Sequence, residues 1–258
     1  MATIKTPPSG STLHALAILE SFDVSNASQS LAAISRRLKI PKATALRILR
    51  ALEEKRYVFR NPGDGSYSLS FGVLGLAQRY LAEFEILTIV RPMLADLAAE
   101  TGETAHFGVL QETEVVYLDI AESPRRVRAY VVRGDHIAAH CVAAGKAILA
   151  HVERPKLEAF LVDKLERFTP ATIVDRQQFL SDLGQTRRRG YALNVGEWNP
   201  DVTGVSAPIF SQNERVLGAI GVAGPISRLD LRNAHQVGKI VSRYARRVSE
   251  VLGGLDAA

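Results

Sequence analysis

The sequence predicts an α+β protein in which an N-terminal winged helix-turn-helix is joined by a linker helix to a domain with an antiparallel sheet. Three observations predict this fold class. Helix and hairpin signals follow one another within the first 72 residues, and strand-like and helix-like segments mix in order after residue 102. The excess of positive charge is confined to the N-terminal part. A length of 258 residues suits one or two domains.

The composition is that of an ordinary globular protein, with 47% hydrophobic and 23% charged residues. These values argue against a mainly disordered or fibrous chain. The longest apolar run, Val216 to Ile226, is shorter than the roughly 20 residues of a membrane-spanning helix, and the N-terminus lacks the apolar core of an export signal. Cys141 is the only cysteine, which excludes an intramolecular disulfide and a multi-cysteine zinc site. We therefore expect a cytoplasmic protein.

The charge is distributed unevenly along the chain. Residues 1–72 contain ten Lys or Arg and five Asp or Glu, so they carry the whole net charge of +5. The rest of the chain holds 22 basic residues (32 minus 10) and 22 acidic residues (27 minus 5). A basic module beside a neutral one indicates a part that binds a polyanion. Charge alone favours a simpler interpretation, a solvated basic surface.

The N-terminal elements follow from apolar spacing and end signals. Apolar residues at helical spacing predict a helix over 11–22. Ser30 is a suitable N-cap for a helix over Leu31–Leu38. After a connection of two residues, Pro41 suits the first position of a helix that continues to about Lys55, because its missing N–H is not needed there. Two helices at a short turn are typical of a helix-turn-helix.

The second helix of this pair has a basic face, and a hairpin follows it. Near its start lie Lys42, Ala43, Thr44, Arg47 and Arg50. Arg side chains read guanine edges in the major groove, and Lys and Thr hold phosphates. Strands at 57–59 and 67–69 flank the turn signal Asn-Pro-Gly-Asp-Gly at 61–65, which predicts a wing that reaches the DNA backbone or the minor groove.

The remaining elements are predicted from the same periodicities. A linker helix over 73–87 joins the two domains or forms a dimer contact. The other predictions are a helix at 88–100, strands at 104–110, 114–120 and 127–133, helices at 143–151, 155–165 and 176–188, strands at 191–195, 202–210 and 217–222, and a final helix at 233–252. This mixed order favours an α+β domain of the kind found in small-molecule sensors.

The sequence contains partial matches to catalytic motifs, each of which lacks a required residue. Gly145-Lys146 ends like a phosphate-binding loop, but His140 stands at the first glycine position and Ala147 at the Ser/Thr position. The segment 204–208 begins like a hydrolase nucleophile elbow, but Pro208 replaces its final glycine. We therefore interpret Lys146 as a charge on the helix surface or behind a site, not as a catalytic amine.

The other candidate groups also favour structural roles. His136 and His140 are four residues apart, as in metalloprotease helices, but no Glu follows His136. Cys141 has no visible activating partner and is expected to act as a small apolar residue. Gly221 and Gly224 are expected to permit close packing or a tight turn. We expect no catalytic residue, no metal and no cofactor.

Two other functions are weighed against a DNA-binding regulator. The first is a small-molecule enzyme with an appended helical domain, which would need a convergent nucleophile and base that the sequence does not show. The second is a protein-interaction module, and the localised charge of +5 counts against it. Steep salt dependence of DNA affinity would separate these functions.

The chain resembles the IclR family of bacterial transcriptional regulators, over about residues 13–252. The stretch HALAILESF and the later SLAAISRRLKIPKATALRILRALEEKRYV are similar to the family's winged helix-turn-helix. Seven further segments occur in the family's order: TGETAHFGVL, VVYLDIAES, AAHCVAAGKAILAH, RFTPATI, RRRGYALNVGEWN, VSAPI and GAIGVAGPISRL. Because these matches extend over both domains, the resemblance is specific.

The resemblance implies a dimeric or tetrameric regulator that binds a pseudo-palindromic operator in double-stranded DNA. It implies a DNA-binding domain over 1–72, a linker helix over 73–87 and a GAF-like, non-catalytic effector domain over 88–258. The DNA-binding residues would be Lys42, Ala43, Thr44, Arg47, Arg50, Arg60 and Tyr67. The effector-binding residues would be Ala129, Ile137, Ala143, Ala144, Asn194, Gly204, Gly221 and Ala223.

The chain departs from the family's polar effector pocket. Members that bind small oxoacids carry an acid, a cysteine and two serines where this chain has Asn194, Gly204, Gly221 and Ala223. Because lost donors leave a small carboxylate poorly compensated, we expect a larger or more aromatic organic acid than glyoxylate or pyruvate. Tyr130, Trp198 and Arg128 are expected at the rim. Alternatively, neighbouring side chains close the pocket, or backbone N–H groups near 142–145 bind the effector.

Overall fold

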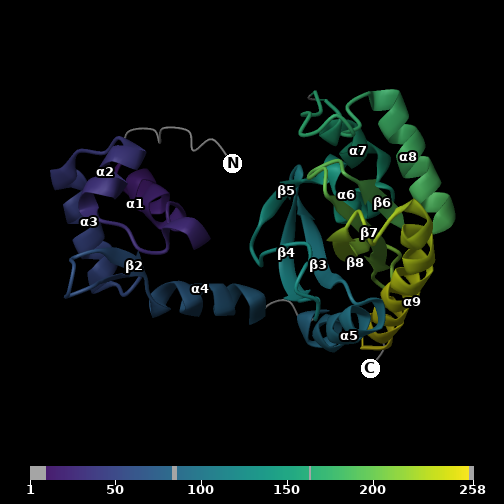
Figure 1. Cartoon of the computed structure of the whole chain (residues 1–258), viewed down its shortest axis with the longest axis horizontal. Coiled ribbons are helices and arrows are strands. Elements are labelled where there is room, and N and C mark those ends of the chain that lie inside the picture. Colours follow the sequence, from purple (N-terminus) through teal and green to yellow (C-terminus); the bar gives the residue numbers. More distant parts are fainter. Residues whose placement is uncertain (1–9, 83–85, 163, 256–258) are drawn as a thin grey trace. The chain divides into compact units, whose positions relative to one another are not determined.

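A computed structural model describes residues 10–82, 86–162 and 164–255 (Figure 1). The chain divides into two units, Met1–Phe84 and Glu85–Ala258. Within the described residues, no helix combines the length and the apolar character that crossing a membrane requires. Each unit has its own core and is described separately.

The N-terminal unit is a winged helix-turn-helix. Its elements are α1 (Ser11–Glu20), the 3₁₀ turn η1 (Val24–Asn26), α2 (Leu31–Leu38), α3 (Lys42–Glu54), β1 (Val58–Arg60), β2 (Tyr67–Leu69) and α4 (Phe71–Ala82). The core comes from all three first helices and the hairpin, through buried residues such as Ile18, Ile34, Leu49 and Val58. The predicted order of helices and strands in this unit is confirmed.

The turn between α2 and α3 follows from three local features. Ser30 caps α2 as predicted, because its Oγ accepts a hydrogen bond from the N–H of Ala33 at 3.2 Å. Lys39 ends the helix in the left-handed conformation, with φ of 54°. Pro41 is the N-cap of α3 and not its first helical residue, since its ψ of 136° is extended. The prediction for Pro41 was therefore wrong by one position.

The linker region differs from the predicted helix over 73–87. Helix α4 begins two residues earlier, at Phe71, and is described as far as Ala82. Residues 83–85 lie outside the described residues, and α5 (Ile86–Thr101) begins at the next one. Exposed apolar side chains on α4 include Phe71, Leu74 and Leu76.

The C-terminal unit is built on a six-stranded sheet in the order β5-β4-β3-β8-β7-β6, in which every neighbouring pair is antiparallel. The strands are β3 (Thr104–Gln111), β4 (Glu114–Ala121), β5 (His136–Ala138), β6 (Ala192–Val195), β7 (Val202–Phe210) and β8 (Val216–Pro225). The two central strands therefore come from opposite ends of the unit's sequence.

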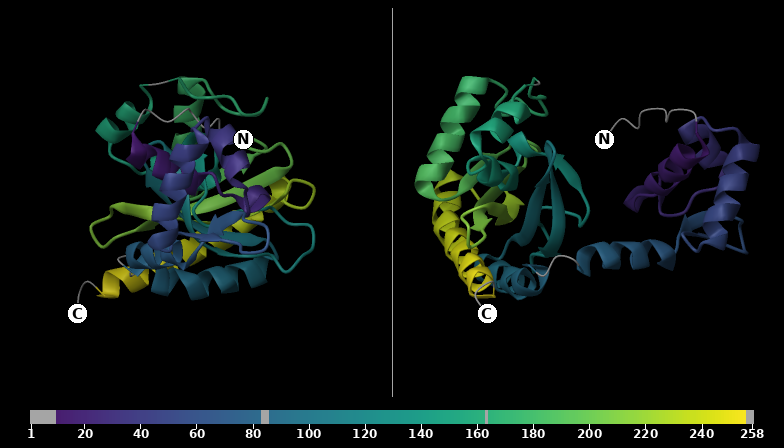
Figure 2. Two further views of the ribbon diagram at one scale, coloured as in Figure 1. Left: turned by 90° about the vertical axis from the view of Figure 1, so that its left-hand side faces the viewer. Right: turned by 180° about the vertical axis from the view of Figure 1, so that it is seen from behind.

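Helices cover the sheet. The helices α5 and α9 (Leu231–Leu255) lie side by side and pack on the strands (Figure 1 and Figure 2). Helix α6 (Ala143–Leu149) packs on β3, β6, β7 and β8, and it also contacts α8 (Arg176–Arg189). The short elements η2 (Ala139–Cys141) and α7 (Arg154–Phe160) complete the unit. The core between α6 and the sheet is rich in alanine, as at Ala143, Ala144 and Ala147.

One predicted strand was wrong, and one strand was missed. Residues 127–133 form no strand, and two of their carbonyls accept hydrogen bonds from side chains. The carbonyl of Ala129 accepts from the Thr104 hydroxyl at 3.1 Å, and that of Val127 accepts from Arg228 at 3.0 Å. The partner of β4 on this edge is β5, three residues long. Such a short strand gives almost no alternation to detect.

Several boundaries also differ. The helix predicted at 155–165 is Arg154–Phe160, and the helix predicted at 143–151 ends at Leu149. The last strand is longer than predicted, Val216–Pro225 in place of 217–222. The strand at Val202–Phe210 has its predicted bounds.

Candidate nucleic-acid interface and ligand cavity

Helix α3 presents a basic face opposite its buried face. Ala45, Ile48 and Leu49 are buried. Lys42, Ala43, Arg47 and Arg50 are exposed, and Thr44 is partly exposed. No ion pair found within the described residues includes Lys42, Arg47 or Arg50. Their charges are therefore open to an external anion.

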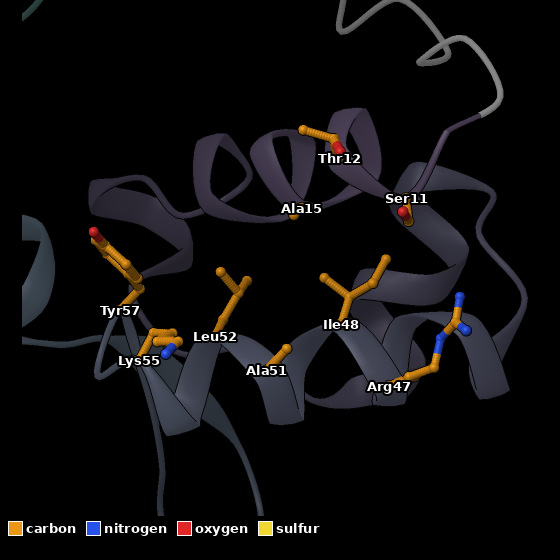
Figure 3. Close-up of a pocket in the computed structure, with 9 residues that line it drawn as sticks. All are labelled: Ser11, Thr12, Ala15, Arg47, Ile48, Ala51, Leu52, Lys55 and Tyr57. Atoms are coloured by element: carbon orange, nitrogen blue, oxygen red, sulfur yellow. The ribbon is translucent and has the colours of Figure 1, made fainter.

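A groove of about 480 Å³ runs between α1 and α3. Figure 3 shows Ile48 and Leu52 pointing from α3 toward α1, with Lys55 and Tyr57 at one end and Arg47 at the other. The guanidinium of Arg47 lies beyond the end of the apolar floor and stays exposed. Arg47 therefore stays accessible to an external anion, although it lines one end of the groove.

The wing is a tight hairpin tip held by its own side chains. The Oδ1 atom of Asn61 accepts from the N–H of Gly63 at 2.9 Å, and Oδ1 of Asp64 accepts from the N–H of Ser66 at 2.9 Å. The bond with Ser66 holds the pKa of Asp64 below its ordinary value. The tip is thus pre-formed.

The two DNA contacts predicted at the wing, Arg60 and Tyr67, differ in their exposure to solvent. Arg60 is exposed, with its guanidinium 5.9 Å from the centroid of the Tyr67 ring. Tyr67 is only 2% exposed and belongs to the core of the unit. We therefore retain Arg60 as a candidate DNA contact and not Tyr67, which supports it from behind.

In the C-terminal unit, a cavity of about 90 Å³ lies between the sheet, α6 and the segment 129–131. Its lining combines small residues with aromatic rings, and within that lining there is no Lys, Arg, Asp or Glu. Six of the eight predicted effector residues line it: Ala129, Ile137, Ala143, Asn194, Gly204 and Ala223.

The other two predicted effector residues lie outside the lining. Ala144 is fully buried in α6. Gly221 lies beneath the cavity, where a Cβ atom would come within 2.0 Å of the Ser206 hydroxyl oxygen. Gly221 therefore permits a close approach between side chains, which agrees with the close packing predicted for it.

His106 and Tyr117 are among the lining residues that were not predicted from the sequence. Their rings meet edge to face, with centroids 5.1 Å apart. Nε2 of His106 lies 3.2 Å from Oγ of Ser206, while Nδ1 is buried without a hydrogen-bond partner among the described residues. Burial lowers the pKa of His106 to about 4 and raises that of Tyr117. A histidine among the apolar residues of the predicted strand at 104–110 is the signal that could have found His106.

Two of the three predicted rim residues are present at the cavity. Tyr130 and Trp198 line it and are 74% and 37% exposed. The Trp198 ring is braced by Phe168, with centroids 4.4 Å apart. Arg128 is not part of the lining, and its guanidinium donates to Glu122 at 2.8 Å.

A buried ionic cluster lies behind Asn194. The Oδ1 atom of Asn194 accepts from the N–H of Glu197 at 2.9 Å. The Glu197 carboxylate lies 2.5 Å from Nζ of Lys146, which is 1% exposed and also 3.0 Å from Asp182. Burial raises the pKa of Glu197, against the opposing effect of Lys146. Lys146 is therefore not a surface charge, as one of the two predicted roles had it, but a buried partner of Glu197, whose N–H bonds to Asn194 on β6.

No catalytic arrangement accompanies this cluster. Burial raises the pKa of the Cys141 thiol to about 12, which leaves it protonated and unreactive. His136 bonds to Glu114, and His140 bonds to the carbonyl of Glu166. Across the described ranges, no group of three or more His, Cys, Asp or Glu is arranged to hold a metal ion.

Comparisons with known proteins cover both units. The family model described as "IclR helix-turn-helix domain" matches residues 11–62, and "Bacterial transcriptional regulator IclR C-terminal" matches residues 78–250. The transcriptional repressor AllR of Escherichia coli K12 is 29% identical over 239 residues, which are 92% of this chain and 88% of AllR. The regulator XynR of the same strain is 30% identical over 218 residues, 84% of this chain and 86% of XynR.

Solved structures of IclR-family proteins are similar in fold to this chain. The Thermotoga maritima IclR structure aligns with a TM-score of 0.80 at 26% identity, covering 93% of this chain and 97% of that one. An IclR homologue from Microbacterium hydrocarbonoxydans, complexed with 4-hydroxybenzoate, gives a TM-score of 0.80 at 21% identity, covering 94% and 100%. The chain belongs to the IclR family of bacterial transcriptional regulators, with a DNA-binding helix-turn-helix and a ligand-binding C-terminal domain, and not to a family of enzymes.

Proposed function

We propose that this regulator binds a pseudo-palindromic operator as a homo-oligomer in the cytoplasm, and that a small organic acid controls its affinity. The acid is larger or more aromatic than glyoxylate or pyruvate. The observation that carries this effector class is the lining of the cavity, in which rings and small residues replace charged groups.

On the DNA side, the proposal assigns α3 to the major groove. Arg47 and Arg50 read base edges, Lys42 and Thr44 hold phosphates, and Ala43 offers a methyl contact to thymine. Arg60 at the wing contacts the backbone beside the groove. The exposure of these residues and their freedom from ion pairs within the described residues support the assignment.

On the effector side, we assign ligand contact to the six predicted residues that line the cavity. The rings of Tyr117, Tyr130 and Trp198 suit the faces of a planar ligand, and Asn194 offers a neutral polar group. Gly204 and Ala223 leave space where side chains would otherwise project. The homologue complexed with 4-hydroxybenzoate supports an aromatic acid as the effector of a protein with this fold.

The size of the cavity adds a condition. A cavity of roughly 150 Å³ is known to hold benzene, whereas this one measures about 90 Å³. An aromatic acid therefore enters only when a rim side chain moves outward. Tyr130 lines the cavity and is 74% exposed, so it is the side chain that we expect to move.

The proposed mechanism is a shift between two arrangements of a dimer. Two recognition helices fit successive major grooves only when their separation is close to one helical turn, about 34 Å, or a multiple of it. An effector that binds one arrangement better changes operator affinity by that difference in binding free energy.

Thermal unfolding against a panel of acids tests the effector class. The panel contains glyoxylate, pyruvate, sugar acids, benzoate and 4-hydroxybenzoate. A ligand at about 100 times its dissociation constant adds roughly 2.7 kcal/mol to the free energy of unfolding. We expect a shift of the melting temperature with the aromatic acids. A shift with glyoxylate or pyruvate alone contradicts the proposed effector class and leaves the regulator assignment intact.

A further inference from the structure

Three residues form a row on adjacent central strands, and the first of them, His106, lines the cavity. His106 on β3 pairs with Gly221 on β8, and Gly221 pairs with Ser206 on β7. These strands lie side by side in the sheet (Figure 1). Because Gly221 has no side chain, the Ser206 hydroxyl occupies the space that a Cβ would fill, and its Oγ lies 3.2 Å from Nε2 of His106.

The burial of this row leaves one of its two donors without a hydrogen-bond partner. Ser206 is 0% exposed and His106 is 3% exposed. Among the described residues, Nε2 of His106 is the hydrogen-bond partner found for the Ser206 hydroxyl. Either direction of this bond leaves one buried donor without a partner: the Nδ1–H of the ring when the hydroxyl donates to Nε2, or the hydroxyl proton when the ring donates. Of the two, only the first gives the ring that lines the cavity a free donor, on Nδ1.

The Nδ1 atom is then a donor with nothing to bind. It is buried and has no hydrogen-bond partner among the described residues, although the ring lines the cavity. With a pKa near 4, the ring is neutral at pH 7 and keeps this single proton. A buried donor without a partner is costly, so a ligand that supplies an acceptor gains from satisfying it. The edge contact with Tyr117 fixes the plane of the ring.

We propose that His106 determines ligand specificity, by donating its Nδ1–H to a carboxylate oxygen of an aromatic acid bound in the cavity. Ser206 is a positioning residue, because it fixes the tautomer, and Gly221 makes the contact between them possible. The inference rests on the proposed effector class and goes beyond it by naming the donor. Since no Lys or Arg occurs in the lining of the cavity, recognition of the acid is through a neutral donor.

The first test needs no ligand. Nitrogen-15 NMR of full-length, histidine-labelled protein at pH 7 reports the tautomer of each ring, and His106→Gln assigns the His106 signal. We expect a neutral His106 with its proton on Nδ1, and loss of that preference in Ser206→Ala. A proton on Nε2, or a charged ring at pH 7, overturns the inference whatever ligand the protein binds.

The second test uses 4-hydroxybenzoate and benzoate in calorimetric titrations of the full chain. In His106→Gln, the amide replaces the Nε2 end of the ring and removes the donor at Nδ1, so we expect affinity to fall at least tenfold. In His106→Asn, the amide lies near the Nδ1 position, and we expect a smaller loss. Phenol, which has no carboxylate, should lose little affinity in either variant.

The outcomes separate the two proposals. The exposed His136 supplies a matched control, because His136→Gln makes the same change away from the cavity lining. Unchanged affinity in His106→Gln overturns the role of His106 and leaves the aromatic effector in place. Failure of the wild-type protein to bind either acid overturns the effector class, and the inference that rests on it fails too.

Discussion

Arg47 is exposed, belongs to no ion pair among the described residues and lies on α3, the helix proposed to enter the major groove. A bidentate contact from Arg to guanine contributes about 1–3 kcal/mol of discrimination. We therefore expect Arg47→Ala to weaken binding to the specific operator by about 1–3 kcal/mol, measured by fluorescence anisotropy. A loss that is equal on specific and unrelated sequences would instead make Arg47 a phosphate contact.

A matched control removes the same charge elsewhere. The side chain of Arg154 on α7 is 90% exposed, and it belongs to the C-terminal unit. Arg154→Ala changes the net charge by the same amount and should leave operator affinity unchanged. A similar loss in both variants would mean that total charge, and not the α3 surface, governs binding.

The lowered pKa of His106 predicts that the stability of the protein depends on pH. Its pKa is lowered from 6.5 to about 4, because burial disfavours the charged ring. Between these pH values the unfolded chain binds a proton that the folded chain does not, so the free energy of unfolding falls as pH falls. This contribution amounts to about 2 kcal/mol between pH 7 and pH 5, and it should be absent in His106→Gln.

Urea unfolding at the two pH values measures this change. Burial lowers the pKa of His140 and His151 in the same direction, so the wild-type loss includes their shares. The difference between wild type and His106→Gln isolates the share of His106. Equal pH dependence in the two proteins would show that the ring takes up a proton without penalty.

At the scale of elements, α6 depends on one glycine. A Cβ at Gly145 would lie 2.0 Å from the carbonyl oxygen of Ala139, which belongs to the backbone of η2. In most helices, replacing Gly by Ala stabilises by about 0.5–1 kcal/mol. Here we expect Gly145→Ala to lower the free energy of unfolding by at least about 1–3 kcal/mol, because the backbone must shift.

Gly184 on α8 provides the control for this prediction. A Cβ there would meet only the end of the Arg188 side chain, at 3.7 Å. Gly184→Ala should therefore be neutral or stabilising in the same denaturation experiment. Stabilisation by both substitutions would contradict the close approach of α6 to η2.

The elements also show what local pattern can predict. Helix α2, with its Ser30 cap, and strand β7 have their predicted bounds, since capping and alternation are local properties. The strand-like residues at 127–133 form no strand, and the carbonyls of Ala129 and Val127 accept from Thr104 and Arg228, which are distant in sequence. A local sequence pattern does not predict a hydrogen-bond donor that lies far along the chain.

The candidate site likewise contains residues that the sequence predicted and residues that it did not. The small lining residues such as Gly204 and Ala223 were predicted through the resemblance to a known family. His106 was not, because its role depends on Gly221 and Ser206 in the neighbouring strands. The sequence left two roles open for Lys146, on the surface or behind a site, since its partners Glu197 and Asp182 follow far along the chain.

At the scale of the whole molecule, regulation requires that the two units be coupled. If an effector changes operator affinity by some factor, the operator changes effector affinity by the same factor. We expect calorimetric titrations of 4-hydroxybenzoate, with and without operator DNA, to give affinities that differ by the factor seen in DNA titrations. Unequal factors would indicate a further bound species, and a factor of one would exclude control by that ligand.

The charge distribution predicts a further property of the whole molecule. The excess of +5 within residues 1–72 should make operator affinity depend steeply on salt, with a slope of roughly −0.9 per phosphate contact in a double-logarithmic plot. Removing one phosphate-contacting side chain, as in Lys42→Ala, should reduce this slope by about 1. A slope that does not change would remove Lys42 from the phosphate contacts.

The pairing of β3 with β8 has a consequence for how the regulator is made. His106 and Ser206 are 100 residues apart, and the strand between them in the sheet ends at Pro225. During translation, the N-terminal unit leaves the ribosome first and folds through contacts that are near in sequence. The sheet of the second unit closes only after Pro225 has emerged. A newly made chain therefore completes its DNA-binding fold before it has a floor for the ligand cavity.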